Sequence, residues 1–161
     1  MNTLIKVGSR FPRVKLYENL PTNIVETTDL LKGKRVVLFG VPGAFTPGCS
    51  KTHLPGYVAD YDKFKKKGVD SLVCVSVNDP FVMEAWGKAY YTENKIRMLA
   101  DTHGELAREL GIVLDIEAKL GNKRMKRFSM LCEDGTVKVF NLEPDGGGLT
   151  CSLSNNILNL I

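Results

Sequence analysis

A short apolar run followed by a loop rich in proline and glycine constrains the fold of this chain more than any other feature. The run, Arg35–Val41, is rich in β-branched residues and predicts a buried central strand. Two prolines and two glycines exclude regular structure from residues 42–48. Cys49 follows, and we expect it to open a helix that ends near Lys67 and is kinked at Pro55. A strand, a rigid loop and a helix therefore meet at this cysteine.

Strand and helix signals alternate along the rest of the chain. We expect further strands at 14–17, 71–77, 97–100, 127–132 and 137–142, and helices at 28–31, 79–91, 104–110 and 155–160. An Asp-Gly pair at 134–135 signals a hairpin between the last two strands. This order predicts an α/β, thioredoxin-like fold with a central mixed β-sheet flanked by helices, in a single domain over residues 1–161.

Composition and charge exclude several classes of protein. Hydrophobic residues make up 43% and charged residues 25% of the 161 residues, as in ordinary globular proteins. The net charge of +4 is mild and scattered, so we expect no nucleic-acid partner. No apolar run approaches the roughly 20 residues that span a membrane, so no membrane association is expected.

The two ends of the chain bear on its location in the cell. Residues 1–8 have no signal-peptide core, and residues 159–161 match no retention or peroxisomal signal. The expected location is cytoplasmic. A mitochondrial protein after leader removal, or a peroxisomal one, is the alternative.

Four cysteines are too few and too widely spaced for a disulfide scaffold, and no C-x-x-C pair occurs. With only two histidines, the chain offers no zinc-type ligand cluster, and we expect neither a metal nor a cofactor. Cys74 and Cys132 fall in predicted strands and are interpreted as packing residues. A reactive role for Cys132 stays open as an alternative.

Cys49 is the best candidate for a reactive group. Free backbone N–H groups and a partial positive charge at a helix start favour a thiolate over a thiol. Thr46 lies three residues earlier, so its hydroxyl is within reach of the sulfur across the first turn. A purely structural cysteine is the alternative, but packing alone does not require such a loop before it.

The run from Phe39 to Gly56, FGVPGAFTPGCSKTHLPG, resembles the active-site signature of the peroxiredoxins, specifically of their type 5, atypical two-cysteine group. The KRFSM segment around Arg127 is similar to the region of the family's active-site arginine. Residues 143–152 resemble the region of its resolving cysteine. The resemblance covers nearly the whole chain and implies a thiol-dependent peroxidase without a cofactor.

By this resemblance Cys49 is the peroxidatic cysteine, which attacks hydrogen peroxide, alkyl hydroperoxides or peroxynitrite and becomes a sulfenic acid. Thr46 exchanges hydrogen bonds with the peroxide, and Arg127 donates to it and to the thiolate from a planar fork that stays charged. Pro42 shields the pocket from water and fixes the loop. Gly48 belongs to the same substrate-binding set.

Three further residues complete the expected site. Phe45 and Phe128 are expected to line the peroxide pocket and to favour alkyl hydroperoxides. Cys151 follows three glycines, whose backbone is flexible. The residues alone leave open whether this stretch moves or is an ordinary turn with Cys151 as a bystander. The resemblance implies that Cys151 forms an intramolecular disulfide with Cys49, which thioredoxin then reduces, and that the protein is a homodimer.

His53 lies about one turn after Cys49, and we expect it to orient the loop or to cap surface groups rather than to act as a base. The basic stretch at 123–127 is expected to form a surface loop, with the exception of Arg127.

Two other functions suit the same fold. A thiol–disulfide oxidoreductase is disfavoured because the second cysteine of a C-x-x-C motif is missing. A thioredoxin-like interaction module does not account for the combination of Thr46, Cys49 and Arg127.

Overall fold

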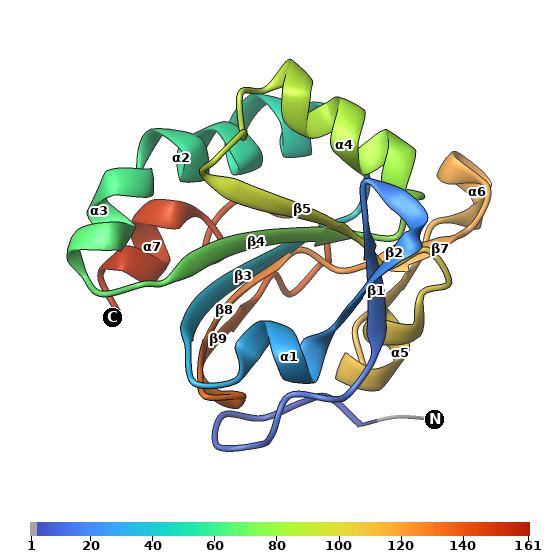
Figure 1. Ribbon diagram of the computed structural model, residues 1–161. Coiled ribbons are helices and arrows are strands. Elements are labelled where there is room, and N and C mark those ends of the chain that lie inside the picture. The colour runs from blue at the N-terminus through green and yellow to red at the C-terminus, as the bar shows by residue number, and fades with distance from the viewer. Residues whose placement is uncertain (1–2) are drawn as a thin grey trace.

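The computed structural model describes residues 3–161 and is built around a seven-stranded mixed sheet (Figure 1). The strand order across the sheet is β2-β1-β5-β4-β3-β8-β9, and β6 and β7 form a separate two-stranded sheet. The strands are β1 (Lys15–Glu18), β2 (Leu20–Glu26), β3 (Arg35–Val41), β4 (Ser71–Ser76), β5 (Ile96–Ala100), β6 (Val113–Asp115), β7 (Lys123–Met125), β8 (Phe128–Glu133) and β9 (Thr136–Leu142).

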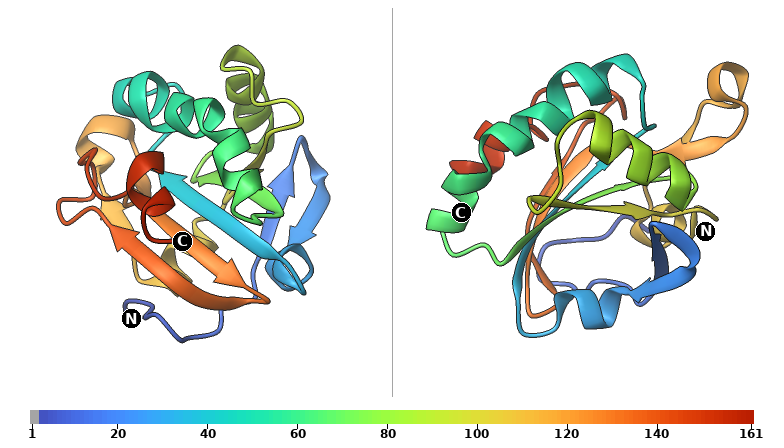
Figure 2. Two further views of the ribbon diagram at one scale, coloured as in Figure 1. Left: turned by 90° about the vertical axis from the view of Figure 1, so that its left-hand side faces the viewer. Right: turned by 45° about the horizontal axis from the view of Figure 1, so that its top comes forward.

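Helices cover both faces of the large sheet. They are α1 (Thr27–Leu31), α2 (Leu54–Ala59), α3 (Tyr61–Lys66), α4 (Pro80–Ala89), α5 (Glu105–Leu110), α6 (Glu117–Leu120) and α7 (Ser154–Leu158), and a π-helical turn, η1 (Cys49–His53), precedes α2. One face carries α2, α3, α4 and α7, and the other carries α1 and α5 (Figures 1 and 2). The prediction of a thioredoxin-like α/β fold with a mixed sheet flanked by helices is confirmed.

Strand β3 lies at the centre of this architecture, as its apolar run predicts. It pairs in parallel with β4 and antiparallel with β8, and all its residues from Val36 onward are buried. Successive side chains of a strand point to opposite faces. Accordingly, Leu38 enters the core beside α1 and α5, whereas Phe39 enters the core beside α2, α3 and α4. Cys49 belongs to the second of these cores.

Two local signals give the structure that the sequence predicts. Asp134 and Gly135 form the two-residue connection between β8 and β9, with φ angles of 47° and 78°. Positive φ at both positions is the requirement of a type I′ hairpin turn. At the start of α4, the side chain of Asp79 accepts a hydrogen bond from Val82 N, and Pro80 occupies the first turn, where its missing N–H costs nothing.

The expectation of one helix from Cys49 to about Lys67, kinked at Pro55 and Gly56, is wrong. The chain forms the π-turn η1, then α2, and then α3 after a break at Asp60. Pro55 lies in the first turn of α2, where it needs no hydrogen-bond donor, so it does not kink that helix. The break occurs where the Asp60 carboxylate accepts a hydrogen bond from Ser154 at 2.7 Å, which ties the helix pair to α7.

The sequence also conceals several short elements. Strand β2 is mostly exposed and lacks an apolar run, so nothing in its pattern indicated a strand. Its connection to β1 depends on Asn19, which has a φ of 68°. The basic stretch expected as a surface loop contains β7, which pairs with β6.

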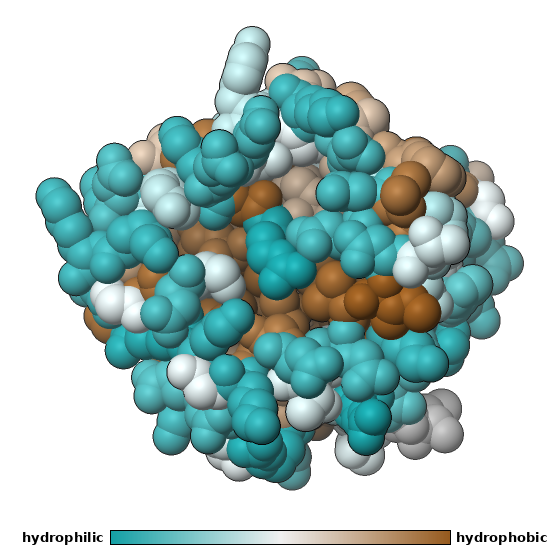
Figure 3. Space-filling view, in the orientation of Figure 1, coloured by the Kyte–Doolittle hydropathy of each residue, from teal (hydrophilic) through white to brown (hydrophobic). Residues whose placement is uncertain are grey.

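Polar and charged side chains cover most of the face seen in Figure 3, around a hollowed middle in which apolar side chains show. Within residues 3–161, none of the helices is long and apolar enough to cross a bilayer.

Candidate active site

Cys49 begins the π-turn at the end of the loop that follows β3. Its side chain is fully buried, and the backbone N–H of Ser50 already bonds back to Thr46 O at 2.9 Å. The N–H of Leu54 bonds to Cys49 O, five residues earlier, which is the wide spacing of a π-helix. Such turns are rare and occur frequently at functional sites. The expected strand, loop and helical start at this cysteine are therefore present, with a wider turn than the sequence predicts.

The hydroxyl of Thr46 faces the sulfur, as its spacing predicts. Its Oγ1 lies 2.9 Å from Cys49 Sγ and 2.7 Å from the carbonyl oxygen of Gly43. A hydroxyl has one hydrogen, so it donates to only one of these at a time. It accepts from a neutral thiol while donating to Gly43, and it donates to the sulfur once the proton has left. Thr46 can therefore form a hydrogen bond with Cys49 whether the sulfur is a thiol or a thiolate.

Arg127 lies just before β8 and is only 4% exposed. Its backbone is fixed by hydrogen bonds to the segment after β9, from Arg127 N to Gly146 O at 2.8 Å and from Glu143 N to Arg127 O at 3.0 Å. The guanidinium approaches the start of the π-turn, because a Cβ on Gly48 would lie 3.3 Å from Nη2. Gly48 thus leaves room for the cation beside Cys49.

His53, at the end of the π-turn, is completely buried between Arg127 and Ser152. Burial and the charge of Arg127 lower the pKa of His53 to about 3, against smaller opposing effects of the Ser152 carbonyl and Glu143. The imidazole is therefore neutral at physiological pH. The expectation that His53 caps surface groups is wrong, because the fold places it in the interior beside Arg127.

A second guanidinium reaches the same loop, and the sequence analysis missed it. Arg124 in β7 donates from Nη1 to the carbonyl oxygen of Pro42 at 3.3 Å and from Nε to Asn122 at 2.7 Å. Burial lowers the pKa of Arg124, and the charge of Cys49 opposes this. The sequence signal for Arg124 is the basic stretch at 123–127, because the side chains of both Arg124 and Arg127 contact the loop that carries Cys49.

The two phenylalanines expected at the peroxide pocket lie in different surroundings. Phe45 is 53% exposed and adopts a positive φ of 62°, a conformation that is strained for a bulky residue. Phe128 is completely buried in the core on the opposite face of the sheet from Cys49, where its ring packs against Phe140. The structure therefore does not bring Phe128 to Cys49, because the alternation of side chains along β8 turns its ring toward the other face of the sheet.

Cys151 is half-buried in the segment between β9 and α7, and its Sγ donates to the carbonyl oxygen of Leu142 at 3.4 Å. All four cysteines are free thiols. Burial and the charge of Glu143 raise the pKa of Cys151. The glycines before it form an ordered turn, in which Asp145 accepts hydrogen bonds from Gly147 N and Gly148 N at 3.0 and 2.7 Å.

Cys74 and Cys132 are completely buried in β4 and β8. Burial raises the pKa of both thiols, that of Cys132 to about 12, so both are held as neutral groups. Their surroundings match the interpretation of packing residues.

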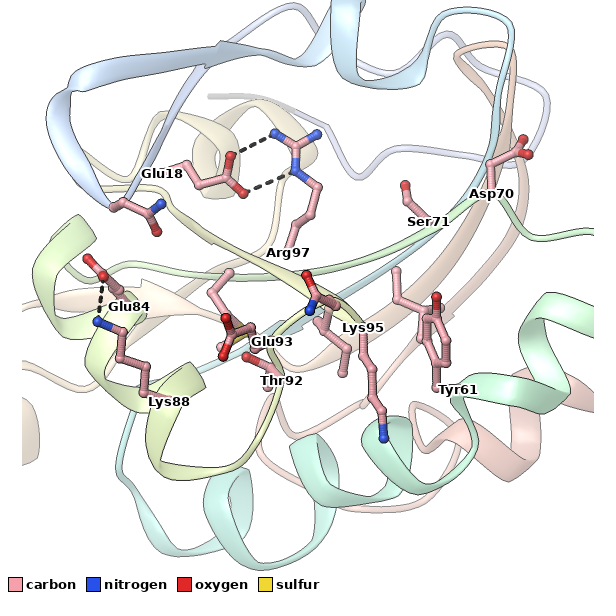
Figure 4. A pocket seen from close by; sticks show the side chains of 15 residues that line it. Glu18, Tyr61, Asp70, Ser71, Glu84, Lys88, Thr92, Glu93, Lys95 and Arg97 are labelled. Carbon is pink, nitrogen blue, oxygen red and sulfur yellow. Dashed lines mark hydrogen bonds and ion pairs between the residues drawn. The ribbon is translucent and has the colours of Figure 1, made fainter.

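A cavity of about 580 Å³ lies away from this site, along β5 and α4 (Figure 4). Charged pairs line it: Arg97 donates to both carboxylate oxygens of Glu18 at 3.0 and 2.8 Å, and Lys88 pairs with Glu84 at 2.9 Å. Within the part of the chain that the structure describes, none of the residues predicted for the site borders it. Cys49 lies in a tight, buried turn rather than in this cavity.

Comparisons with known proteins agree with this geometry. The sequence profile of the Redoxin family matches residues 6–157. Peroxiredoxin-2B of Arabidopsis thaliana is 44% identical over 144 residues, which cover 89% of this chain and 88% of the relative.

Two solved structures extend the match to the fold. Peroxiredoxin 5 from Alvinella pompejana has a TM-score of 0.83 at 48% identity and covers 91% of this chain and 95% of its own. Reduced Prx3 from Vibrio vulnificus in complex with hydrogen peroxide has a TM-score of 0.92 at 40% identity and covers 98% of this chain and all of its own. The chain belongs to the peroxiredoxin family, in its type 5 group, and is a thiol-dependent peroxidase.

Proposed function

We propose that the protein reduces hydrogen peroxide and alkyl hydroperoxides, with peroxynitrite as a further substrate, and that Cys49 is the nucleophile. The observation that carries the proposal is the surroundings of this sulfur. The Thr46 hydroxyl lies 2.9 Å from Cys49 Sγ, and the Arg127 guanidinium reaches the same turn past Gly48. Both groups donate hydrogen bonds, so both favour negative charge where the peroxide bond breaks.

In the first step the thiolate of Cys49 attacks one peroxide oxygen. A sulfur–oxygen bond forms and the oxygen–oxygen bond breaks. The leaving oxygen takes up a proton to give water or an alcohol, and with peroxynitrite the leaving group is nitrite. Thr46 and Arg127 stabilise the negative charge that moves onto the leaving oxygen. Pro42 fixes the loop, because its carbonyl is held by Arg124. The product is a sulfenic acid on Cys49.

In the second step the sulfur of Cys151 attacks the sulfenic acid, a Cys49–Cys151 disulfide forms, and the sulfenic oxygen leaves as water. We propose that a thioredoxin then reduces the disulfide by thiol–disulfide exchange. Cys151 is supported in this role by its partial exposure, which distinguishes it from Cys74 and Cys132.

We also propose a homodimer in the cytoplasm. The exposed aromatic side chains of Phe45 and Phe81 are available for a subunit contact, since each is more than half exposed. Sedimentation of the wild type and of Phe81→Ser would test the dimer, and imaging of a fluorescent fusion would test the compartment.

Stopped-flow fluorescence tests the chemical proposal, because the one tryptophan reports on the reactive turn. Trp86 Nε1 donates to Ser50 Oγ at 3.0 Å, next to Cys49. We expect a fast, peroxide-dependent phase that Cys49→Ser abolishes. Intact mass is expected to fall by two hydrogens in the wild type and to rise by one oxygen in Cys151→Ser.

Other outcomes would redirect the assignment. An internal disulfide that persists in Cys151→Ser would move resolution to Cys74 or Cys132. Reduction of insulin disulfides without reaction toward peroxide would favour a thiol–disulfide oxidoreductase. A Cys49→Ser variant as fast as the wild type would contradict the proposed nucleophile.

A further inference from the structure

A chain of hydrogen bonds joins the active-site arginine to the segment that carries Cys151. Arg127 Nη1 lies 3.1 Å from His53 Nδ1, and His53 Nε2 lies 3.0 Å from the carbonyl oxygen of Ser152. A guanidinium only donates, so Nδ1 of the neutral imidazole must accept, and the ring hydrogen is on Nε2, where it donates to Ser152. The backbone of the residue after Cys151 therefore fixes both the tautomer of His53 and the acceptor that Arg127 meets.

The far end of this chain is held by one carboxylate. Glu143 Oε2 accepts hydrogen bonds from Ser152 N at 2.9 Å and Ser152 Oγ at 2.6 Å. The same carboxylate accepts from Thr150 N at 2.9 Å and Thr150 Oγ1 at 2.6 Å. Glu143 is 1% exposed, so these bonds are protected from water. We call residues 150–152, held in this way, the clasped loop.

The protonation states suit this arrangement across the physiological range. Burial opposes the ionisation of Glu143, but the hydrogen bonds from Ser152 and Thr150 outweigh it and lower its pKa to about 2. Burial and Arg127 keep His53 neutral. The Glu143 carboxylate therefore accepts hydrogen bonds, and the His53 imidazole links Arg127 to Ser152 without gaining a proton.

We propose, on the basis of the proposed peroxidase function, that the clasped loop is a working part of the peroxide site. Glu143 holds Ser152, the Ser152 carbonyl holds His53, and His53 sets the orientation of Arg127 toward Cys49. Glu143 and His53 are thus positioning residues for the first chemical step.

The second step undoes this arrangement. Cys151 points its sulfur at the Leu142 carbonyl and has to leave that contact to bond with Cys49. When the loop leaves, Ser152 no longer holds His53, and the guanidinium of Arg127 keeps only its longer hydrogen bond, from Nε to the carbonyl oxygen of Gly147 at 3.4 Å. Peroxide therefore meets a fully oriented arginine only while Cys151 is reduced and the loop is clasped.

Substitutions at His53 test the relay, with Tyr57 as the matched control. The Tyr57 hydroxyl donates to the same Ser152 carbonyl at 2.8 Å, and its ring is equally buried. We expect His53→Phe to slow the fast peroxide phase by about tenfold or more, because a hydrogen bond to a charged group is lost. His53→Asn, which restores an acceptor near the Nδ1 position, is expected to recover part of the rate. Tyr57→Phe is expected to remain within about twofold of the wild type.

Glu143→Asp tests the clasp at its other end and serves if His53→Phe does not fold, as judged by thermal unfolding. It keeps the charge but withdraws the carboxylate by one methylene. We expect a slower fast phase together with a faster second phase, in which the disulfide forms. A variant that was only less stable would not separate the two phases in opposite directions.

A His53→Phe variant that reacts as fast as the wild type would overturn the inference. Equal slowing in Tyr57→Phe would do the same, since it would assign the effect to general loosening. Both outcomes are distinct from a failure of the proposed function, which would show as a wild type without a fast phase that depends on Cys49.

Discussion

Cys49 and Cys151 lie in opposite electrostatic surroundings. Cys49 is completely buried, faces the Thr46 hydroxyl and is close to two guanidinium groups. Cys151 is more exposed, yet it faces a carbonyl oxygen and the charge of Glu143, which raises its pKa together with burial. Exposure alone would rank the second thiol as the more reactive. Under the proposed function, we expect the charges around each sulfur to reverse that order, because the raised pKa of Cys151 keeps it a thiol.

Removal of the Arg127 guanidinium beside Cys49 gives the largest expected effect. We expect Arg127→Ala to slow peroxide reduction by about 100-fold or more, as for loss of a donor to a developing negative charge. If the pKa of an ordinary thiol is lowered until it is ionised at pH 7, its thiolate fraction rises about 30-fold. The nucleophilicity of that thiolate falls about 13-fold at the same time, so the net gain in rate is only about twofold. Charge stabilisation must therefore dominate.

Stopped-flow rates compared with the thiolate fraction, measured by ultraviolet absorbance, check the Arg127 prediction. Arg127→Lys is the control, and we expect only partial recovery because an ammonium lacks the planar fork. A rate loss equal to the change in thiolate fraction would contradict the prediction.

Loss of the hydroxyl at position 46 is expected to have a smaller effect. Thr46→Val keeps the shape of the side chain but removes the group 2.9 Å from Cys49 Sγ. We expect the peroxide step to slow by about tenfold, the cost of one hydrogen bond to a charged group. Thr46→Ser keeps the hydroxyl and is expected to stay within about threefold. Equal rates for the valine and serine variants would remove the hydroxyl from the mechanism.

The effect of the Glu143 charge on Cys151 is tested by the reactivity of Cys151 toward iodoacetamide. In a Cys49→Ser background, we expect Glu143→Gln to speed alkylation of Cys151 a few-fold at neutral pH, because loss of the charge lowers the pKa of that thiol and increases its thiolate. Intact mass follows the reaction. The gain is expected to vanish at high pH, where both forms are ionised. A gain that persists there would indicate loosening of the loop instead.

The sequence predicts best those elements whose signal is local. The Asp134-Gly135 pair requires its hairpin turn, and the apolar run of β3 requires burial on both faces. His53 could not be placed in this way, since its partners, Arg127 and Ser152, are far from it in the sequence and meet it only in the folded protein.

The error at Phe128 has a different origin. Arg127 and Phe128 are neighbours at the start of a predicted strand, and neighbours in a strand point to opposite faces. The two-residue period of a strand therefore already places Arg127 and Phe128 on opposite faces of the sheet. The π-turn, in contrast, carries no such local signal, because a wide turn and an ordinary helical turn share the same residue preferences here.

The π-turn at Cys49 also has a mechanical consequence. The Leu54 N–H is tied to the Cys49 carbonyl, and α2 continues beyond it with Pro55 in its first turn. Because a proline nitrogen has no hydrogen, the helix after the turn is not linked back to it through that residue. A typical backbone hydrogen bond contributes only about 1 kcal/mol net. We therefore expect the π-turn that carries Cys49 to open more readily than α2 if the two cysteines form a disulfide.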